Sequence, residues 1–120
     1  MIPHIDATAS GSITIEGETY THDVLIRLSG QIIERKKALS ESVYGTDHVL
    51  SLDEAKHIYE EGTERLIIGT GRLKRLRLSE KAKAFFREKG CRVTLESTPQ
   101  AAQIWNGAHE KALGLFHVDC

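Results

Sequence analysis

The stretch LIIGTG at residues 66–71 decides the fold class. An apolar, largely β-branched run ends abruptly at Gly69, and a second glycine, Gly71, follows after one threonine. Such a run is typical of a strand that is buried on both faces in the middle of an α/β sheet. Because ligands of open α/β sheets bind beside the carboxyl ends of the strands, the glycine turn is also a candidate site.

Length and composition indicate one globular domain, which we expect over residues 1–120. Apolar residues make up 40% of the chain and charged residues 28%, which is ordinary for a globular protein. The net charge of -1 gives no overall attraction to nucleic acid or to anionic membranes. The sequence has no apolar run of membrane-spanning length, and its first residues do not resemble a signal peptide. We therefore expect a cytoplasmic protein.

The two cysteines, Cys91 and Cys120, form neither a disulfide framework nor a zinc-binding pattern. We predict two free thiols, no bond between them, no metal and no cofactor.

The first half of the chain is predicted to be a β-meander. Alternating residues at 12–15 and 19–21 flank a tight turn, and two further strands are expected at 24–28 and 31–35. Residues 37–50 have weak periodicity and carry a glycine, so we interpret them as a surface loop. This half is too small to fold alone, and we expect it to pack on the sheet as an added layer.

The second half alternates helices and strands. A capping box, in which Ser51 and Glu54 satisfy each other's amides, predicts a helix start, and Gly62 is expected to follow that helix. A second helix is predicted from the N-cap Ser79 to Gly90, and a third from Thr98 as N-cap. With the strands expected at 66–68, 91–95 and 113–117, this order indicates an α/β sheet with crossover connections.

Several motifs occur together along the chain and carry a family resemblance. They are IEGETYTHD at 15–23, His48 before a helix, LIIGTG at 66–71, GCRV at 90–93, TPQA at 98–101 with Asn106, and FHVDC at 116–120. This pattern resembles the Mth-like family of small, largely uncharacterised α/β proteins. That family includes the mitochondrial complex I assembly factor 3 and the adipogenesis-associated Mth domain protein.

The resemblance covers nearly the whole chain and implies a fold class: α/β, with a mixed central sheet flanked by helices and an additional N-terminal antiparallel β layer. It implies no established enzymatic activity or cofactor. One difference concerns a tryptophan that is common in the family after the second hairpin, where this chain has Glu34 and Arg35. The only tryptophan here is Trp105, where relatives often have tyrosine.

The glycine turn has two interpretations. The amides of Gly69, Thr70 and Gly71 could form an anion-binding nest, with Arg72 and Arg75 supplying charge. A dinucleotide fingerprint is excluded, because position 74 is lysine and no helix follows at once. The simpler interpretation is a tight strand exit that needs positive φ, and we favour it.

Most of the basic residues lie in one segment, opposed there only by Glu80 and Glu88. They are Arg65, Arg72, Lys74, Arg75, Arg77, Lys81, Lys83, Arg87, Lys89 and Arg92. This segment could attract a phosphate or carboxylate. We favour a solvated face whose charges balance acidic residues such as Glu60, Glu61 and Glu64. Sequence-specific recognition of nucleic acid is not expected, because no aromatic residues alternate with the basic ones.

The end of the chain offers a further set of polar residues. His117 and Cys120, with an aspartate between them, could ligate a metal or activate a thiol, but a metal site needs more ligands. We favour a structural hydrogen bond for His117. Asp23, Asn106 and His117 are predicted to line the same cleft as Thr70 if they are functional, and otherwise to bond turns or helix ends.

These observations favour a non-catalytic protein-interaction or assembly factor with an unknown protein partner. The alternative is a small-molecule or anion-binding protein, or an enzyme, that uses the cleft at Gly69–Arg72.

Overall fold

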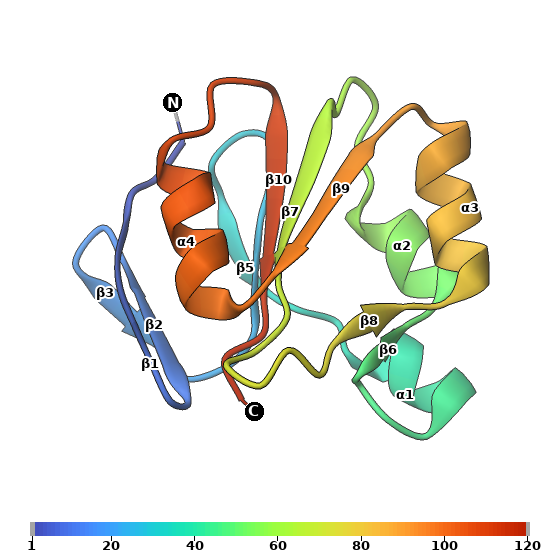
Figure 1. Cartoon of the computed structure of the whole chain (residues 1–120), viewed down its shortest axis with the longest axis horizontal. Coiled ribbons are helices and arrows are strands. Elements are labelled where there is room, and N and C mark those ends of the chain that lie inside the picture. The colour runs from blue at the N-terminus through green and yellow to red at the C-terminus, as the bar shows by residue number, and fades with distance from the viewer. Residues whose placement is uncertain (1, 120) are drawn as a thin grey trace.

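A computed structural model describes residues 2–119, and its centre is a five-stranded mixed sheet (Figure 1). In spatial order the strands are β5 (Ile32–Glu34), β4 (Val24–Ile26), β10 (Ala112–Phe116), β7 (Arg65–Gly69) and β9 (Arg92–Glu96). The last three run parallel to one another, whereas β4 is antiparallel to both β10 and β5. The predicted mixed α/β sheet is therefore confirmed.

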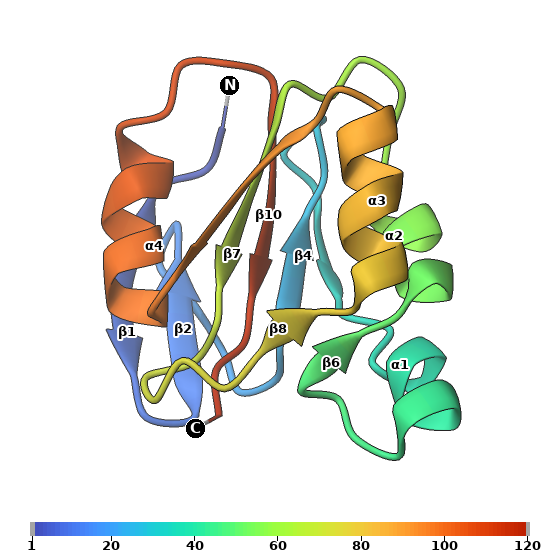
Figure 2. The same ribbon diagram turned by 45° about the vertical axis from the view of Figure 1, so that its right-hand side comes forward.

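Both faces of this sheet are covered, as Figures 1 and 2 show. One face carries α4 (Thr98–Asn106) and a three-stranded antiparallel sheet of β1 (Ile5–Ala9), β2 (Ser12–Ile15) and β3 (Glu18–Tyr20). The other side carries α1 (Ala38–Tyr44), α2 (Leu52–Ile58), α3 (Glu80–Glu88) and a short parallel pair, β6 (Val49–Leu50) and β8 (Arg77–Leu78). None of the described helices has the length and apolar character that crossing a membrane requires.

The alternation of side chains along β7 builds a core on each face. Leu66 and Ile68 pack toward α2 and α3, whereas Ile67 packs toward α4 and the N-terminal layer. All three side chains are completely buried. The strand predicted from the apolar run is thus central and covered on both sides, because α/β packing leaves neither face open to water.

The predicted N-terminal layer is present, but the meander is divided between two sheets. Ile13 and Ile15 of β2 pack into the same cluster as Trp105 of α4. The Trp105 indole Nε1 donates a hydrogen bond to the Pro3 carbonyl oxygen at 2.8 Å, which joins the layer to the helix. After β3 the chain leaves this layer, and β4 and β5 form a hairpin inside the central sheet.

The prediction of a surface loop over residues 37–50 is wrong. This segment contains α1 and the short strand β6. Only Ser40 is buried in α1, so the helix has almost no apolar face to reveal it in the sequence. Gly45, which indicated a loop, is the left-handed residue that ends α1, at φ +70°. Gly62 also differs from its prediction, because α2 ends at Ile58 and Gly62 lies in the following turn.

Two helix starts also test the capping predictions. The Ser79 hydroxyl accepts a hydrogen bond from the Ala82 amide, which confirms Ser79 as the N-cap of α3. In α4 the N-cap is Ser97, one residue before the predicted Thr98. The hydroxyl of Thr98 does not cap the helix, because it bonds the ends of two strands instead.

Candidate functional site

The glycine turn closes the carboxyl end of β7, beside the end of β10 and the start of α4. Gly69 is required by close packing, since a Cβ atom there would lie 2.9 Å from Phe116 Cδ1 and 3.1 Å from Thr98 Cα. Gly71 is required by its backbone, which has φ +95°. The positive φ of Gly71 agrees with the simpler interpretation of a tight strand exit, whereas Gly69 belongs to β7 and is needed for close packing and not for a positive φ.

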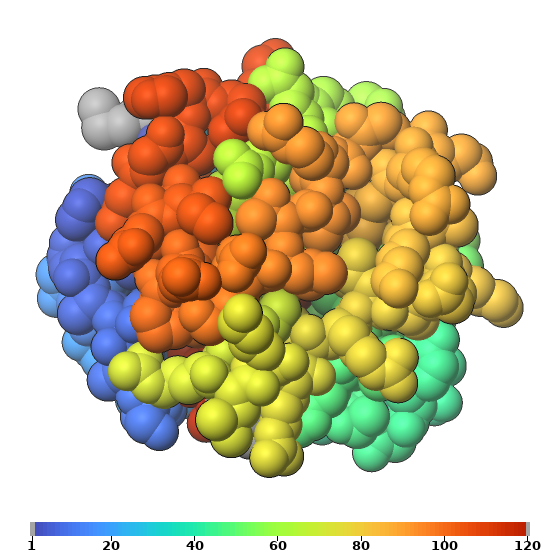
Figure 3. Space-filling model, in the orientation of Figure 1, coloured from blue at the N-terminus to red at the C-terminus, as the bar shows by residue number. Residues whose placement is uncertain are grey.

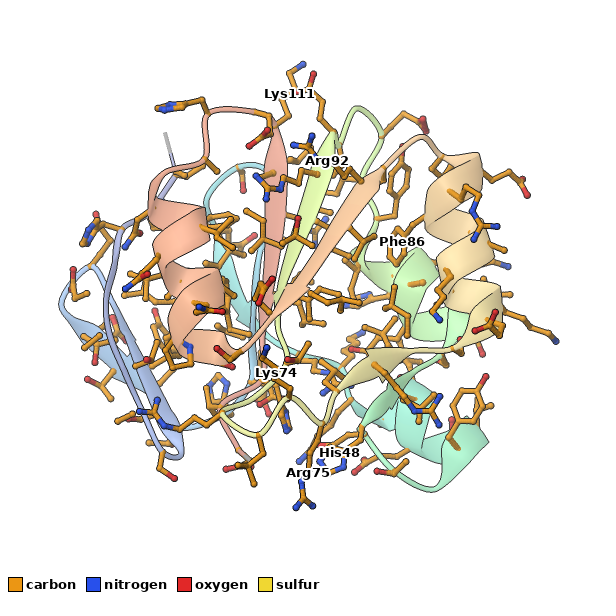
Figure 4. The ribbon with its side chains drawn as sticks, in the orientation of Figure 1. His48, Lys74, Arg75, Phe86, Arg92 and Lys111 are labelled. Carbon is orange, nitrogen blue, oxygen red and sulfur yellow. The ribbon has the colours of Figure 1, made fainter. Side chains whose placement is uncertain are left out.

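The amides of this turn already have acceptors inside the chain. The Thr70 amide donates to the Glu96 carbonyl at 2.8 Å, and the Gly71 amide donates to Thr98 Oγ1 at 2.9 Å. The Thr70 hydroxyl also donates to the Glu96 carbonyl, at 2.9 Å. An anion at this turn would consequently depend on the side chains of Arg72 and Arg75. Both are exposed, and Figure 4 shows Arg75 and Lys74 at this end of the sheet. Anion binding here stays a prediction.

Asp23 and His117, two of the residues predicted to line one cleft with Thr70, are in direct contact, and a functional cleft at this place stays a prediction. The His117 ring bonds Asp23 Oδ2 through Nδ1 at 2.7 Å, and the Val118 amide donates to Asp23 Oδ1 at 2.9 Å. Thr98 adds a link, because its hydroxyl donates to the His117 carbonyl at 2.6 Å. These bonds fasten the end of β10 to β4 and α4.

Asn106 lies at the opposite end of α4 from Thr98. Its side-chain amide pairs with the backbone of Ile5, donating through Nδ2 and accepting through Oδ1, each at 2.9 Å. This pairing fastens β1 to α4. Asn106 is therefore separated from Asp23 and His117 by the length of the helix.

A buried arginine organises the polar residues around Asp23. Arg35 is 4% exposed, and its Nη1 donates to Asp23 Oδ2 at 2.9 Å. Its Nε and Nη2 donate to the two oxygens of Glu54, at 2.7 and 3.0 Å, and Nη2 also donates to the Asp47 carbonyl at 2.8 Å. Glu54 is completely buried and also accepts a hydrogen bond from the Ser40 hydroxyl. One guanidinium thus links β4, β5, α2 and the segment before β6.

Arg35 is not among the predicted site residues, and the prediction for Glu54 is a capping box with Ser51. The Ser51 hydroxyl does accept from the Glu54 amide, at 3.1 Å, but the Ser51 amide donates to Ser40 Oγ and not to Glu54. The helical period of the sequence was the signal that could have shown that Glu54 is buried. Glu54 lies four residues before the buried Ile58, so it belongs to the inward face of α2.

The charges in this network stabilise one another. Burial raises the pKa of Asp23, but the bonds from His117, the Val118 amide and Arg35 hold it below its ordinary value. Burial lowers the pKa of Arg35, but Glu54 and Asp23 raise it overall. Asp23 and Arg35 are therefore ionised near neutral pH, and each forms hydrogen bonds within the network, whereas the buried Nε2 of His117 has no partner among the described residues.

Metal binding at this place is opposed by the same arginine. Asp23, Asp47 and His117 could bring ligand atoms within 4.8 Å of one another. A divalent ion there would lie close to the guanidinium of Arg35, which already occupies Asp23 Oδ2.

A polar cavity of about 90 Å³ adjoins the network, lined by Thr21, His22, Asp23, Glu34, Arg35, Lys37, Asp47 and Asp119. By volume it has room for about three water molecules.

The sulfur chemistry of the described residues is limited to Cys91. Its side chain is buried and free, and burial raises the pKa of the thiol to about 11. Cys120 lies outside the described residues, so its predicted free thiol and its pairing with His117 stay predictions.

Strand β9 forms an open edge of the central sheet. It pairs with β7 on one side only and is the last strand of the sheet. The Arg92 amide donates to Glu64 of the β7 side, and the Glu96 carbonyl accepts from Thr70. Since bonding groups alternate along a strand, Val93 and Leu95 direct their N–H and C=O groups to the open edge. Figure 3 shows residues of β9 at the surface beside α3.

A groove lies next to this edge, on the α3 side of the sheet. Its volume is about 310 Å³, and it is lined by Leu78, Lys83, Phe86, Arg87, Cys91, Val93 and Leu95. Leu95 is 41% exposed, which is unusual for a leucine in a strand of the central sheet. Figure 4 shows Phe86 on α3 and Arg92 on the neighbouring strand.

A larger hollow of about 540 Å³ lies at the other end of β10, around Ala108–Ala112, away from the residues discussed above.

Among the described residues, no basic residue of the segment 65–92 forms an ion pair within 4.0 Å with Glu60, Glu61 or Glu64. Glu60 pairs with Arg27, at 2.8 Å, while Arg65 and Arg92 both pair with Glu110, at 3.4 and 2.9 Å. The remaining pairs of the segment are exposed: Lys74 with Glu96 at 3.9 Å and Lys83 with Glu80 at 3.0 Å. Among the described residues, Arg72, Arg75, Arg77, Lys81, Arg87 and Lys89 make no ion pair within 4.0 Å. Of the basic residues in this segment, Lys83 and Arg87 line the groove, and Arg72, Lys74 and Arg75 lie in the turn after β7.

Comparisons with known proteins agree with the predicted family and fold. A sequence model described as "Protein of unknown function (DUF498/DUF598)" matches residues 5–112. The conserved hypothetical protein PH1505 from Pyrococcus horikoshii is 28% identical, with a TM-score of 0.88 over 97% of this chain and 98% of that one. The protein MT938 is 26% identical, with a TM-score of 0.81 over 98% and 99% of the two chains. A Mth938-like domain from Bordetella pertussis is 16% identical, with a TM-score of 0.65 over 98% and 86%. No curated protein matches the chain.

Proposed function

We propose that this chain, which belongs to the DUF498/DUF598 family of Mth-like proteins of unknown function, is a non-catalytic binding protein that receives an extended segment of a partner protein at the edge of β9. Such a protein could act as an assembly factor by holding a strand of its partner. The proposed compartment is the reducing cytoplasm, and the free, buried thiol of Cys91 agrees with it.

The observation that carries this proposal is the combination of an open strand edge with an apolar groove beside it. In strand addition, main-chain hydrogen bonds supply affinity, and pockets for alternate side chains supply specificity. Val93 and Leu95 offer the main-chain groups, and the groove between β9 and α3 offers the pocket. An edge strand presents unpaired main-chain groups to another chain, and the exposed Leu95 adds an apolar contact to those of β9.

The polar network is better explained by stability than by catalysis. Asp23, Arg35, Glu54 and His117 are each at least nine-tenths buried and bond one another. A catalytic acid or base must reach a proton of the substrate, and of these four side chains only Asp23 and Arg35 border the small polar cavity, where both already bond other members of the network.

Anion binding at the Gly69–Arg72 turn remains the alternative proposal. Its support is the exposed Arg72 and Arg75 on a turn at the carboxyl end of β7. Against it, the amides of Thr70 and Gly71 are bonded to Glu96 and Thr98. We therefore rank it below binding at the β9 edge.

The experiment compares capture of partner proteins from native lysate by wild type and by two variants of one residue. Leu95→Ala removes the side chain and keeps the outward amide. Leu95→Pro removes both, and it is compatible with an edge strand because the lost N–H does not bond β7. A specific partner should be retained in the order wild type, Leu95→Ala, Leu95→Pro. Slower amide exchange at Val93 and Leu95 in the purified complex should accompany it. Equal capture by all three folded proteins, with unchanged exchange at β9, would reject the proposal.

A further inference from the structure

We infer that the segment received by β9 is acidic as well as apolar, with apolar side chains directed into the groove and carboxylates toward Lys83 and Arg87. This inference rests on the proposed function and adds the chemistry of the partner. It follows from the shape of the groove, from the charges at its rim and from the complementarity that an added strand requires.

The apolar part follows from strand geometry. A strand paired with β9 would lie about 4.8 Å from it and would direct every second side chain to the α3 face. On that face β9 itself presents Val93 and Leu95, and Phe86 of α3 lines the same groove. An apolar side chain of the added strand would therefore contact Leu95 and cover its exposed surface, as cross-strand neighbours do.

The acidic part follows from the rim. Lys83 and Arg87 line the groove from α3, and neither side chain is buried. Lys83 is paired with Glu80, but the Glu80 side chain is 90% exposed, so this pair is weak and exchangeable. Arg87 has no ion pair among the described residues. No acidic side chain of the described residues lines the groove, so carboxylates of an added strand would meet uncompensated positive charge.

A second copy of this chain fits the edge less well. An antiparallel β9 pairing centred on Thr94 would place Arg92 opposite Glu96 of the other copy, which is favourable. It would bring no carboxylate of either strand to the α3 face, however, because Arg92 and Glu96 lie on the other face of the sheet from Val93 and Leu95. Lys83 and Arg87 of both copies would remain unneutralised at the junction. A segment of another protein that is both apolar and acidic would fill the groove and also neutralise Lys83 and Arg87 at its rim.

The test uses short capped peptides in which the positions that face α3, every second residue, are taken in turn by leucine and by glutamate, serine or lysine, while threonine fills the positions of the other face. Binding to the whole protein is measured by fluorescence anisotropy at low and at high salt. We expect the glutamate peptide to bind about tenfold more tightly than the serine peptide at low salt, and the difference to shrink with added salt. The double variant Lys83→Glu/Arg87→Glu should lose that preference. The matched control, Lys81→Glu, changes an exposed lysine of the same helix that does not line the groove, and should keep it.

The outcomes separate this inference from the proposed function. If glutamate and serine peptides bind equally, and Leu95→Pro weakens both, the edge binds strands but the acidic preference is wrong. If no peptide binds and Leu95→Pro leaves partner capture unchanged, the proposed function itself is wrong. If the wild type is a dimer in sedimentation experiments and Leu95→Pro is a monomer, the occupant is a second copy, and the inference is overturned.

Discussion

Replacing Arg35 by methionine should be strongly destabilising. Arg35 is 4% exposed, and its removal leaves the carboxylates of Asp23 and Glu54, which are 8% and 0% exposed, without their shared cation. Removing one partner of a buried ion pair costs about 3–5 kcal/mol, because the remaining charge stays buried and uncompensated. This is a large fraction of the roughly 5–15 kcal/mol by which a typical domain is stable.

Urea unfolding followed by circular dichroism at neutral pH measures this change. With a slope of about 1–3 kcal/mol per molar urea, the midpoint should fall by at least about 1 M. The matched control is Arg27→Met, in the same hairpin, whose ion pair with Glu60 is partly exposed and should contribute less than about 1 kcal/mol. The double variant Arg35→Met/Glu54→Met should be more stable than the sum of the single changes implies, because it removes one of the orphaned carboxylates. If Arg35→Met is no less stable than Arg27→Met, the network does not stabilise the fold as we describe.

The same kind of reasoning applies at four other sites. Ile67→Ala, on the central strand, should cost about 2–5 kcal/mol in urea unfolding, and an unchanged midpoint would show that the strand is peripheral. The pKa of Asp23 lies below its ordinary value of 3.8, so its carboxylate stabilises the folded state above about pH 4 and this contribution is lost as the pH falls through the folded pKa. Asp23→Asn should therefore be less stable at neutral pH and less sensitive to acid, as measured by unfolding across an acidic to neutral pH series. The Cys91 thiol, with its pKa raised to about 11, should react with a thiol reagent much more slowly in the folded than in the unfolded protein, and equal rates would contradict its burial. If phosphate raises the melting temperature, Arg72→Ala/Arg75→Ala should abolish that shift without unfolding the protein, and a shift that survives would place the anion elsewhere.

The sequence could predict the elements whose signals are local. The run at 66–68 indicated a strand covered on both faces, and Ser79 indicated the start of α3, because strand burial and N-capping depend on adjacent residues. Helix α1 was missed because it is short and exposed, so that its sequence lacks an apolar period. Gly45 does not distinguish a helix end from a loop in the sequence, because glycine is common in both.

The polar network could not be predicted because its partners are distant in sequence. Arg35 and Glu54 are 19 positions apart, and Asp23 and His117 are 94 positions apart. Asp23 and His117 were expected to share a cleft from the family resemblance and from the position of β10. The charge balance of Arg35 depends on three segments that only the folded chain brings together. The hydrogen bond of the Gly71 amide could not be predicted for the same reason, because its acceptor, the Thr98 hydroxyl, belongs to α4 and is distant in sequence.

The hydrogen bonds at the end of the sheet bear on the choice of the proposed binding site. In open α/β sheets the carboxyl ends of parallel strands usually supply the ligand site. Here Thr98 bonds the Gly71 amide and the His117 carbonyl, while Asp23 bonds His117 and the Val118 amide. The polar groups that would meet a ligand are thus used to hold β7, β10 and α4 together. Main-chain groups directed out of the sheet lie instead along its edge strands, β5 and β9, and β9 has the apolar groove beside it, which is why the proposed contact is a strand and not a small molecule.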